Sequence, residues 1–266
     1  MTTLRPAELA DWLIANGRHF VTNDEIAELV DVAPGEVRHS LRRQRDAHTI
    51  VPVTKGAWVP VPPQYRRNGA PPVDHFIDPL MGFLGHQYYV GFLSAAALYG
   101  ASHQAPIVFQ VVTDAILRDR RIGAQQVAFI RRRDTAHRAT QRRMVPTGRI
   151  RVASPEVVVL DLVEGPHYGA GLSNVATVIA ELLDGGEIDP VRLAEQAQGY
   201  PTAVVQRAGH LVERMSRALD APFDLDSLAS LVGTAPPVDL RPASPTSDFR
   251  DNRWNVTINI EIEPDL

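Results

Sequence analysis

Arginine and histidine side chains are concentrated in the stretch VRHSLRRQRD, at residues 37–46. If Val37 and Leu41 face a core, helical spacing turns a cationic set to the other side of the helix. That set is Arg38, His39, Arg42 and Arg43. Guanidinium groups bind guanine edges or phosphate oxygens with two hydrogen bonds, and backbone amides near a helix start add an anion site. The spacing therefore predicts contact with duplex DNA, and the alternative is a solvated cationic face.

The neighbouring elements must position this helix. Apolar spacing predicts a first helix over residues 6–16 and a second from Thr22, with Glu25 in the position of a capping box. The cationic helix is expected from Pro34 to about Ala47, and a hairpin with a Thr-Lys-Gly turn follows it. This order is that of a winged helix-turn-helix, with Lys55 in the wing. The predicted DNA-binding set is completed by Thr22, Asn23 and Gly35.

The net charge of -4 conceals an asymmetry along the chain. Residues 1–151 hold 20 Lys and Arg against 13 Asp and Glu, whereas residues 152–266 hold 7 against 18. The first half is therefore the half suited to a polyanion. Residues 118–151 contain 11 arginines. We interpret them either as a second polyanion surface or as exposed strand and loop residues, and the sequence leaves both open.

Several classes of chemistry are excluded by what the chain lacks. Lys55 is the only lysine and follows no glycine pattern, so no phosphate-binding loop of the Walker type is present. With no cysteine and no nucleophile or zinc motif, we expect neither catalytic residues, nor a metal, nor a cofactor. The carboxylates Glu156, Asp161 and Glu164 could be considered as a metal cluster. Their spacing and the apolar residues between them instead favour a buried helix with a capping glutamate at its start. The sequence has neither a signal sequence nor an apolar run long enough to span a membrane, so we expect a cytoplasmic protein. Because no catalytic motif is present, we also expect that the protein is not an enzyme.

The chain is long enough for two cores, and an α+β fold class is expected. We predict a winged helix-turn-helix domain at residues 1–61, a proline-rich linker at 62–79 and a larger α+β domain at 80–266. In that domain residues 79–100 should be helical in two pieces, and strands are expected at 107–113, 127–131 and 149–152. A helix that contains Leu160 should start after Ser154-Pro155-Glu156, and further helices should follow at 172–184, 190–198, 202–219 and 226–232. The alternating RWNVTINIEIE at residues 253–263 predicts a strand with one buried face.

A family resemblance extends these expectations. The winged helix together with YYVGFLSAAALYGASHQAP, IVFQVV, GRIRVASPEVVVLDLVE and GLSNVATVIAELL resembles the AbiEi-type antitoxins of abortive-infection toxin-antitoxin systems. The likeness runs from about Ala7 to Leu219. It implies repression of the chain's own promoter through inverted repeats in double-stranded DNA. It also implies opposition, direct or indirect, to a cognate toxin with a nucleotidyltransferase-like fold.

The prediction is therefore an autoregulating antitoxin whose winged helix binds DNA. The first alternative is a one-component regulator whose second domain binds a small-molecule effector, which would need a sizeable apolar pocket. The second is a nuclease that uses the arginine-rich stretch, which would need a carboxylate cluster for a hard cation.

Overall fold

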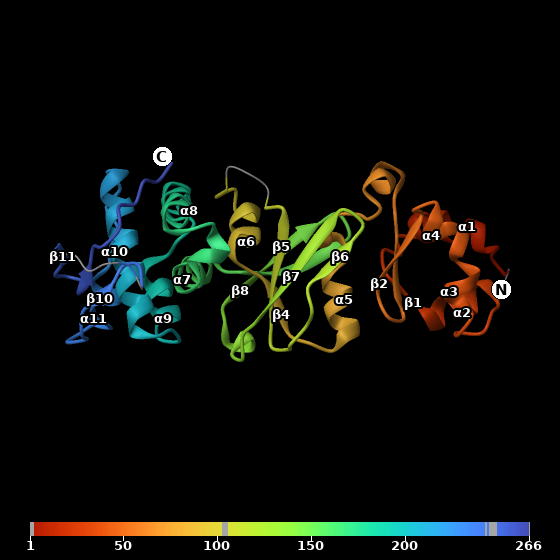
Figure 1. The fold of residues 1–266 in the computed structure, drawn as a ribbon, viewed down its shortest axis with the longest axis horizontal. Coiled ribbons are helices and arrows are strands. Elements are labelled where there is room, and N and C mark those ends of the chain that lie inside the picture. Colours follow the sequence, from red (N-terminus) through yellow and green to blue (C-terminus); the bar gives the residue numbers. More distant parts are fainter. Residues whose placement is uncertain (1–2, 103–105, 243, 245–248, 266) are drawn as a thin grey trace. The chain divides into compact units, whose positions relative to one another are not determined.

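The computed structural model describes residues 3–102, 106–242, 244 and 249–265. The fold is mixed α+β, as predicted, with helices and three sheets among these residues (Figure 1). By their contacts the residues form two units. The first comprises Met1–Tyr89, Ile107–Ala136 and Arg142–Arg151, and the second comprises Val90–Pro106, His137–Gln141 and Val152–Leu266. The domain boundaries at residues 61 and 79 stay a prediction, because contacts alone do not show which part folds independently.

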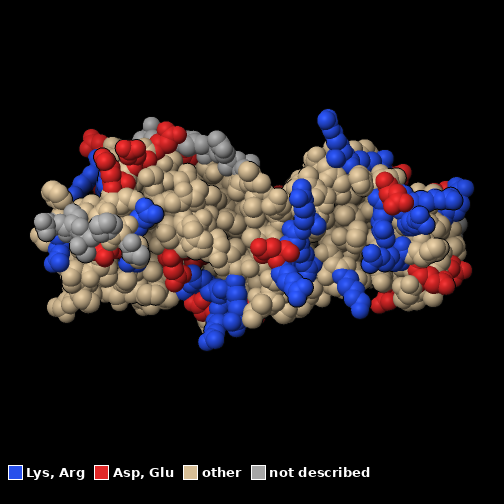
Figure 2. Space-filling model, in the orientation of Figure 1, with Lys and Arg blue, Asp and Glu red and all other residues tan. Residues whose placement is uncertain are grey.

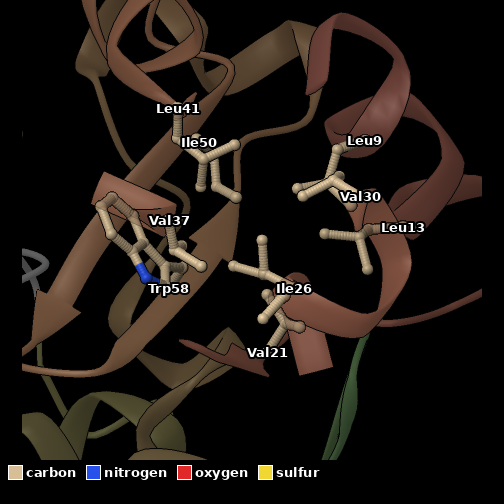
Figure 3. Close-up of a cluster of buried hydrophobic side chains, with 10 residues drawn as sticks. Leu9, Leu13, Val21, Ile26, Val30, Val37, Leu41, Ile50 and Trp58 are labelled. Carbon is tan, nitrogen blue, oxygen red and sulfur yellow. The ribbon is translucent and has the colours of Figure 1, made fainter. Parts of the chain in front are cut away.

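The N-terminal region has the predicted order of three helical segments and a hairpin. Its elements are α1 (Pro6–Ala15), β1 (Val21–Thr22), α2 (Asn23–Val30), α3 (Val37–Ser40), α4 (Arg42–Asp46), β2 (Ile50–Thr54) and β3 (Ala57–Pro60). The strands form a sheet of order β1-β3-β2 with antiparallel pairing. Apolar side chains from the helices and the sheet converge on one cluster, which includes Leu9, Ile26, Val37, Leu41 and Trp58 (Figure 3).

The capping box at the start of α2 is confirmed. The Thr22 hydroxyl accepts a hydrogen bond from the Glu25 amide (3.3 Å), and the Glu25 carboxylate accepts one from the Thr22 amide (2.7 Å). Each side chain thus satisfies a backbone donor that the first helical turn leaves without a partner.

The prediction of one continuous helix over residues 34–47 is wrong, because the structure divides it at Leu41 into α3 and α4. The Ser40 hydroxyl donates to the Val37 carbonyl (2.9 Å), which also accepts the Leu41 amide (3.0 Å). Such side-chain bonds compete with the helical ladder. Like charges four residues apart, at Arg38 and Arg42, weaken the helix further.

The proline-rich stretch holds no long helix, as predicted. It contains two short 3-10 turns, η1 (Pro63–Asn68) and η2 (Val73–His75). The Asn68 carbonyl accepts a hydrogen bond from the Ala124 amide (2.7 Å). Gly123, with φ +58, passes so close that a Cβ there would lie 2.4 Å from the same oxygen. The stretch is therefore fixed to the first unit.

A central sheet follows, with strand order β6-β7-β5-β4-β9-β8. Helix α5 (Ile77–Leu84) precedes the sheet, and α6 (Phe92–Leu98) follows its first strand. The strands are β4 (Tyr88–Val90), β5 (Val108–Thr113), β6 (Arg120–Ile122), β7 (Gln125–Arg131), β8 (Thr140–Val145) and β9 (Gly148–Ala153). The predicted strands β5, β7 and β9 and the two helical pieces α5 and α6 are present. The prediction missed β6 and β8, and also β4, which separates the two helical pieces.

The helices that follow the central sheet along the chain agree with the predicted ones. They are α7 (Pro155–Glu164), α8 (Leu172–Asp184), α9 (Pro190–Ala197), α10 (Thr202–Ala218) and α11 (Asp226–Ser230). Nine consecutive residues of α7, from Pro155 to Val163, are buried, so this helix lies in the core.

The predicted C-terminal strand over residues 253–263 is wrong. Only β12 (Val256–Thr257) is strand within it, in a small sheet with β10 (Val238–Asp239) and β11 (Arg250–Asp251). Asn255 has a left-handed φ of +51, which interrupts the extended backbone. The alternation did mark burial correctly for Trp254 and Val256, which are both fully buried.

Candidate nucleic-acid interface

The cationic residues of α3 and α4 are oriented by the core beneath them. Val37 and Leu41 are fully buried, and the next position on the same side, Gln44, is 7% exposed. The side chains on the other side are exposed, and they are those of Arg38, His39, Arg42 and Arg43. The structure therefore exposes the face that the spacing predicted, although two short helices build it.

Gln44 departs from an otherwise apolar set of core positions. Its Oε1 atom is buried and has no hydrogen-bond partner in the described part of the chain. Burying an amide oxygen without a partner costs about 1 to 3 kcal/mol.

A surface hollow of about 780 Å³ lies on this face. Its lining includes His39 and the three arginines Arg5, Arg42 and Arg43. Sequence reasoning missed Arg5, which precedes α1 and forms an ion pair with Glu8. Its position just before a predicted helix start was the one sequence feature that could have indicated Arg5. That Arg5 lies near α4 depends on the tertiary fold.

The charges of this face are weakly compensated. Arg42 Nε lies 3.9 Å from Asp46 Oδ2, and both side chains are well exposed. Such an ion pair is worth little in water and can exchange its carboxylate for a phosphate. On the face shown in Figure 2, Lys and Arg gather over the elements labelled α1 to α4 in Figure 1, with some Asp and Glu between them.

The hairpin that carries Lys55 is held in place from one side. Lys55 is exposed in the turn between β2 and β3, and Gly56 provides the left-handed φ of +86 that the turn requires. On β2, the Val53 carbonyl accepts a hydrogen bond from Arg120 Nη1 (2.7 Å). Burial lowers the pKa of this guanidinium. The wing is thus fixed to β6, while its tip stays open to solvent.

The remaining predicted DNA contacts lie in different surroundings. The Thr22 side chain belongs to the capping box, and Asn23 Oδ1 accepts a hydrogen bond from Trp58 Nε1 (2.7 Å). Both are half-buried and serve the fold. Gly35 is exposed in the turn before α3. The DNA contacts predicted for these three residues stay predictions.

The arginines of residues 118–151 do not form a uniform surface. Arg138 is buried, with its guanidinium 3.7 Å from the centre of the Tyr200 ring and a hydrogen bond to the Gly199 carbonyl (2.8 Å). Others, such as Arg131, Arg133 and Arg142, are exposed. Part of the set therefore supports the fold, and part is open to solvent.

The carboxylates considered for a metal serve the core. Glu156 Oε1 accepts a hydrogen bond from the Asp189 amide (3.1 Å), and Asp161 Oδ1 accepts one from the Tyr200 hydroxyl (2.7 Å). No group of three His, Asp or Glu suited to a metal ion occurs among the residues that the structure describes. Within those same residues, every helix is too short or too polar to cross a membrane.

Comparisons with known proteins agree with this architecture. Residues 89–214 match the family model described as the AbiEi antitoxin C-terminal domain. The crystal structure of the RV2827C protein from Mycobacterium tuberculosis is similar to this chain with a TM-score of 0.66 and 17% identity. That similarity covers 96% of this chain and 92% of the other, and at this identity it shows a shared fold alone. No curated protein matches the chain in sequence.

Proposed function

Because residues 89–214 belong to the family of the AbiEi antitoxin C-terminal domain, we propose that this antitoxin-family chain opposes a nucleotidyltransferase-like toxin from its own operon and represses its own promoter. The family match confirms the AbiEi resemblance found in the sequence. It does not include the winged helix, so repression is proposed from the residues themselves. The protein would act in the cytoplasm, without a cofactor and without catalytic activity of its own.

One observation carries the DNA-binding half of the proposal. Arg38, His39, Arg42 and Arg43 are exposed together on the side of α3 and α4 that faces away from the core. A cationic helix face together with an exposed wing residue, here Lys55, is the combination with which winged helices bind a groove and the adjacent backbone. The excess of Lys and Arg in residues 1–151 would strengthen association with the phosphate backbone.

The toxin-opposing half rests on the family. We assign it to the C-terminal region, and both a direct complex and an indirect route are compatible with the proposal. The sign of the charge differs from that of the first half, since residues 152–266 hold 18 Asp and Glu against 7 Lys and Arg. A surface of that sign would repel DNA and leave the second unit to meet a protein.

Promoter binding tests the first half. Arg42→Ala or Arg43→Ala should lower affinity for the chain's own promoter by about 1 to 3 kcal/mol if the side chain reads a base. The matched control is Arg192→Ala, which removes an exposed arginine from α9 and should leave the gel shift unchanged. Unchanged binding by both α4 variants would remove this helix from the proposal.

Growth tests the second half. Expressing the adjacent gene should arrest growth, and co-expressing this chain should restore it. Arg42→Ala and Arg43→Ala should restore growth as well as the parent does when transcription comes from an unrelated promoter. A neighbouring gene that is harmless when expressed alone would count against the antitoxin assignment.

The effector-binding alternative receives less support. The hollow of about 540 Å³ in the second unit is bordered by Glu181, Asp184, Glu187 and Asp265. Four carboxylates around one open hollow exceed the few convergent polar groups of a typical small-molecule pocket.

A further inference from the structure

A small hollow on the central sheet holds three arginines. Arg142 of β8 and Arg149 and Arg151 of β9 line it, together with Asp78 of α5. Arg149 and Arg151 are two residues apart on one strand, so their side chains share a face, and Ile150 between them is buried. The volume of the hollow is about 180 Å³.

Hydrogen bonds fix two of the residues that line the hollow, Asp78 and Arg151. The Tyr88 hydroxyl donates to Asp78 Oδ1 (2.8 Å) and accepts from the Arg151 amide (3.3 Å). Burial and the nearby Asp78 carboxylate raise the pKa of Tyr88 far above its usual value, so its hydroxyl keeps the proton that it donates. Arg151 Nη1 donates to Gln87 Oε1 (2.7 Å). The guanidinium and the carboxylate are therefore positioned before any ligand arrives.

The charges of this hollow are not balanced by the protein. Three guanidinium groups face one carboxylate, and no ion pair joins Arg142, Arg149 or Arg151 to any acid in the described part of the chain. The Arg149 Nε–H donates to the sulfur of Met144, a weak acceptor, at 3.3 Å. Like charges that converge repel one another, and an anion between them would remove that cost.

The chemistry favours a phosphoryl group. Guanidinium forks match phosphate oxygens with paired hydrogen bonds, and three forks can neutralise a dianion. Pockets for whole drug-sized ligands measure roughly 300 to 1,000 Å³, so this hollow takes a single phosphate with the rest of the ligand outside.

The Asp78 carboxylate distinguishes between a phosphate of the nucleic-acid backbone and the terminal phosphate of a small ligand. A backbone phosphate of nucleic acid is flanked on both sides by further anions, and the Asp78 carboxylate repels them. A terminal phosphate enters from one end, and its ligand can donate a hydroxyl or amino group to Asp78. We propose that this hollow binds the terminal phosphate of a small phosphorylated ligand, such as a nucleoside triphosphate.

Calorimetry with the full chain tests the proposal, with inorganic phosphate and ATP as probes. Both should bind the parent protein, and Arg142→Gln and Arg149→Gln should each weaken binding about tenfold, as expected for the loss of a charged hydrogen bond. Arg121→Gln is the matched control, because Arg121 is an exposed arginine of the same sheet outside the hollow, and it should bind as the parent does. Circular dichroism verifies that each variant is folded.

Asp78→Asn provides a test with the opposite sign. The amide oxygen can still accept from Tyr88, but the negative charge is lost, so phosphate and ATP should bind several-fold more tightly. A merely structural Asp78 would give no tightening. Failure of the parent to bind either probe at millimolar concentration overturns the proposal.

Promoter DNA distinguishes this site from the winged helix. Arg142→Gln and Arg149→Gln should leave promoter affinity unchanged, and Arg42→Ala should leave ATP binding unchanged. If the two glutamine variants weaken DNA binding and not ATP binding, the hollow holds a backbone phosphate and the small-molecule assignment is wrong. The two proposals can thus fail separately.

Discussion

Arginine side chains serve different purposes in the winged helix and around α10. In α3 and α4, Arg38 and Arg43 are exposed, and the ion pair that Arg42 forms with Asp46 is long, at 3.9 Å. These side chains retain hydrogen-bonding capacity for a partner. The winged helix is instead held together by an almost wholly apolar cluster.

Around α10 the arginines hold the chain itself. Arg207 Nε donates to the Asp239 carbonyl (2.8 Å), and Arg214 Nη2 donates to the Ile262 carbonyl (2.9 Å). Arg253 Nη1 donates to the buried Glu213 carboxylate (2.7 Å). Arginine content alone therefore identifies no binding surface, because the surrounding acceptors decide which guanidinium groups stay available to a partner.

The close contact between α10 and the C-terminal residues gives the largest expected effect. A Cβ at Gly209 would lie 2.1 Å from ring carbons of Trp254, which is fully buried and donates its indole N–H to Glu213 (2.8 Å). Gly209→Ala should lower the free energy of unfolding by about 3 kcal/mol, as overpacking at a rigid contact does. Urea denaturation measures it.

Gly82 is the control for that substitution. It also lies in a helix, and nothing lies within 4 Å of a Cβ built there. Gly82→Ala should be neutral or stabilising by up to about 1 kcal/mol, because alanine favours a helix. Equal losses in both variants would show that the Trp254 contact is not what Gly209 provides.

A pair of arginine substitutions tests the comparison directly. Arg253→Ala should reduce the free energy of unfolding by roughly 1 to 2 kcal/mol, since it removes ion pairs to Glu213 and Asp226 while its side chain is 39% exposed. It should leave promoter affinity unchanged. Arg43→Ala should do the reverse, with stability within about 0.5 kcal/mol of the parent. Urea denaturation measures the stability of both variants, and gel shift measures their promoter affinity. A variant that loses both stability and promoter affinity would contradict the distinction between structural and DNA-binding arginines.

The sequence predicted well what depends on neighbours along the chain. Helices α8 and α10 follow from apolar spacing, and the capping box of Thr22 and Glu25 lies within four residues. Predicting the strands required knowledge of their partners, since β4 is only three residues long and is stabilised by β5 and β9 on either side. The C-terminal alternation indicated burial, but no long strand among the described residues lies beside it to pair with.

The candidate site divides in the same way. Exposure of Arg42 and Arg43 follows from the burial of Leu41 next to them, so spacing predicted it. Arg5 is distant in sequence and joins the hollow only through the fold. The hydrogen bond of Asn23 spans 35 residues to Trp58, and no local pattern predicts it.

Gln44 offers a way to sharpen the division inside the winged helix. Gln44→Leu replaces a buried oxygen without a partner in the described part of the chain by an apolar group of similar size. The free energy of unfolding should rise by roughly 1 kcal/mol with promoter affinity unchanged. Gln198→Leu, at an exposed position, should give no gain. Loss of DNA binding in Gln44→Leu would show that the core side of α4 also takes part in recognition.

The smallest expected effect concerns Glu25 in the capping box. Burial would raise the pKa of its carboxyl, but hydrogen bonds from Thr22 and the charge of Arg18 outweigh burial and lower it below its ordinary value of 4.5. A carboxyl whose pKa is lower in the folded state stabilises the fold above that ordinary value and loses this contribution as pH falls through the folded value. Glu25→Gln should therefore destabilise the fold by less than about 1 kcal/mol at neutral pH, and the difference in free energy of unfolding between this variant and the parent should shrink at pH ~3.

Glu28→Gln, at an exposed position of the same helix, should show no such trend in urea denaturation at the two pH values. A difference that is equal at both pH values would mean that Glu25 contributes through packing and not through its charge.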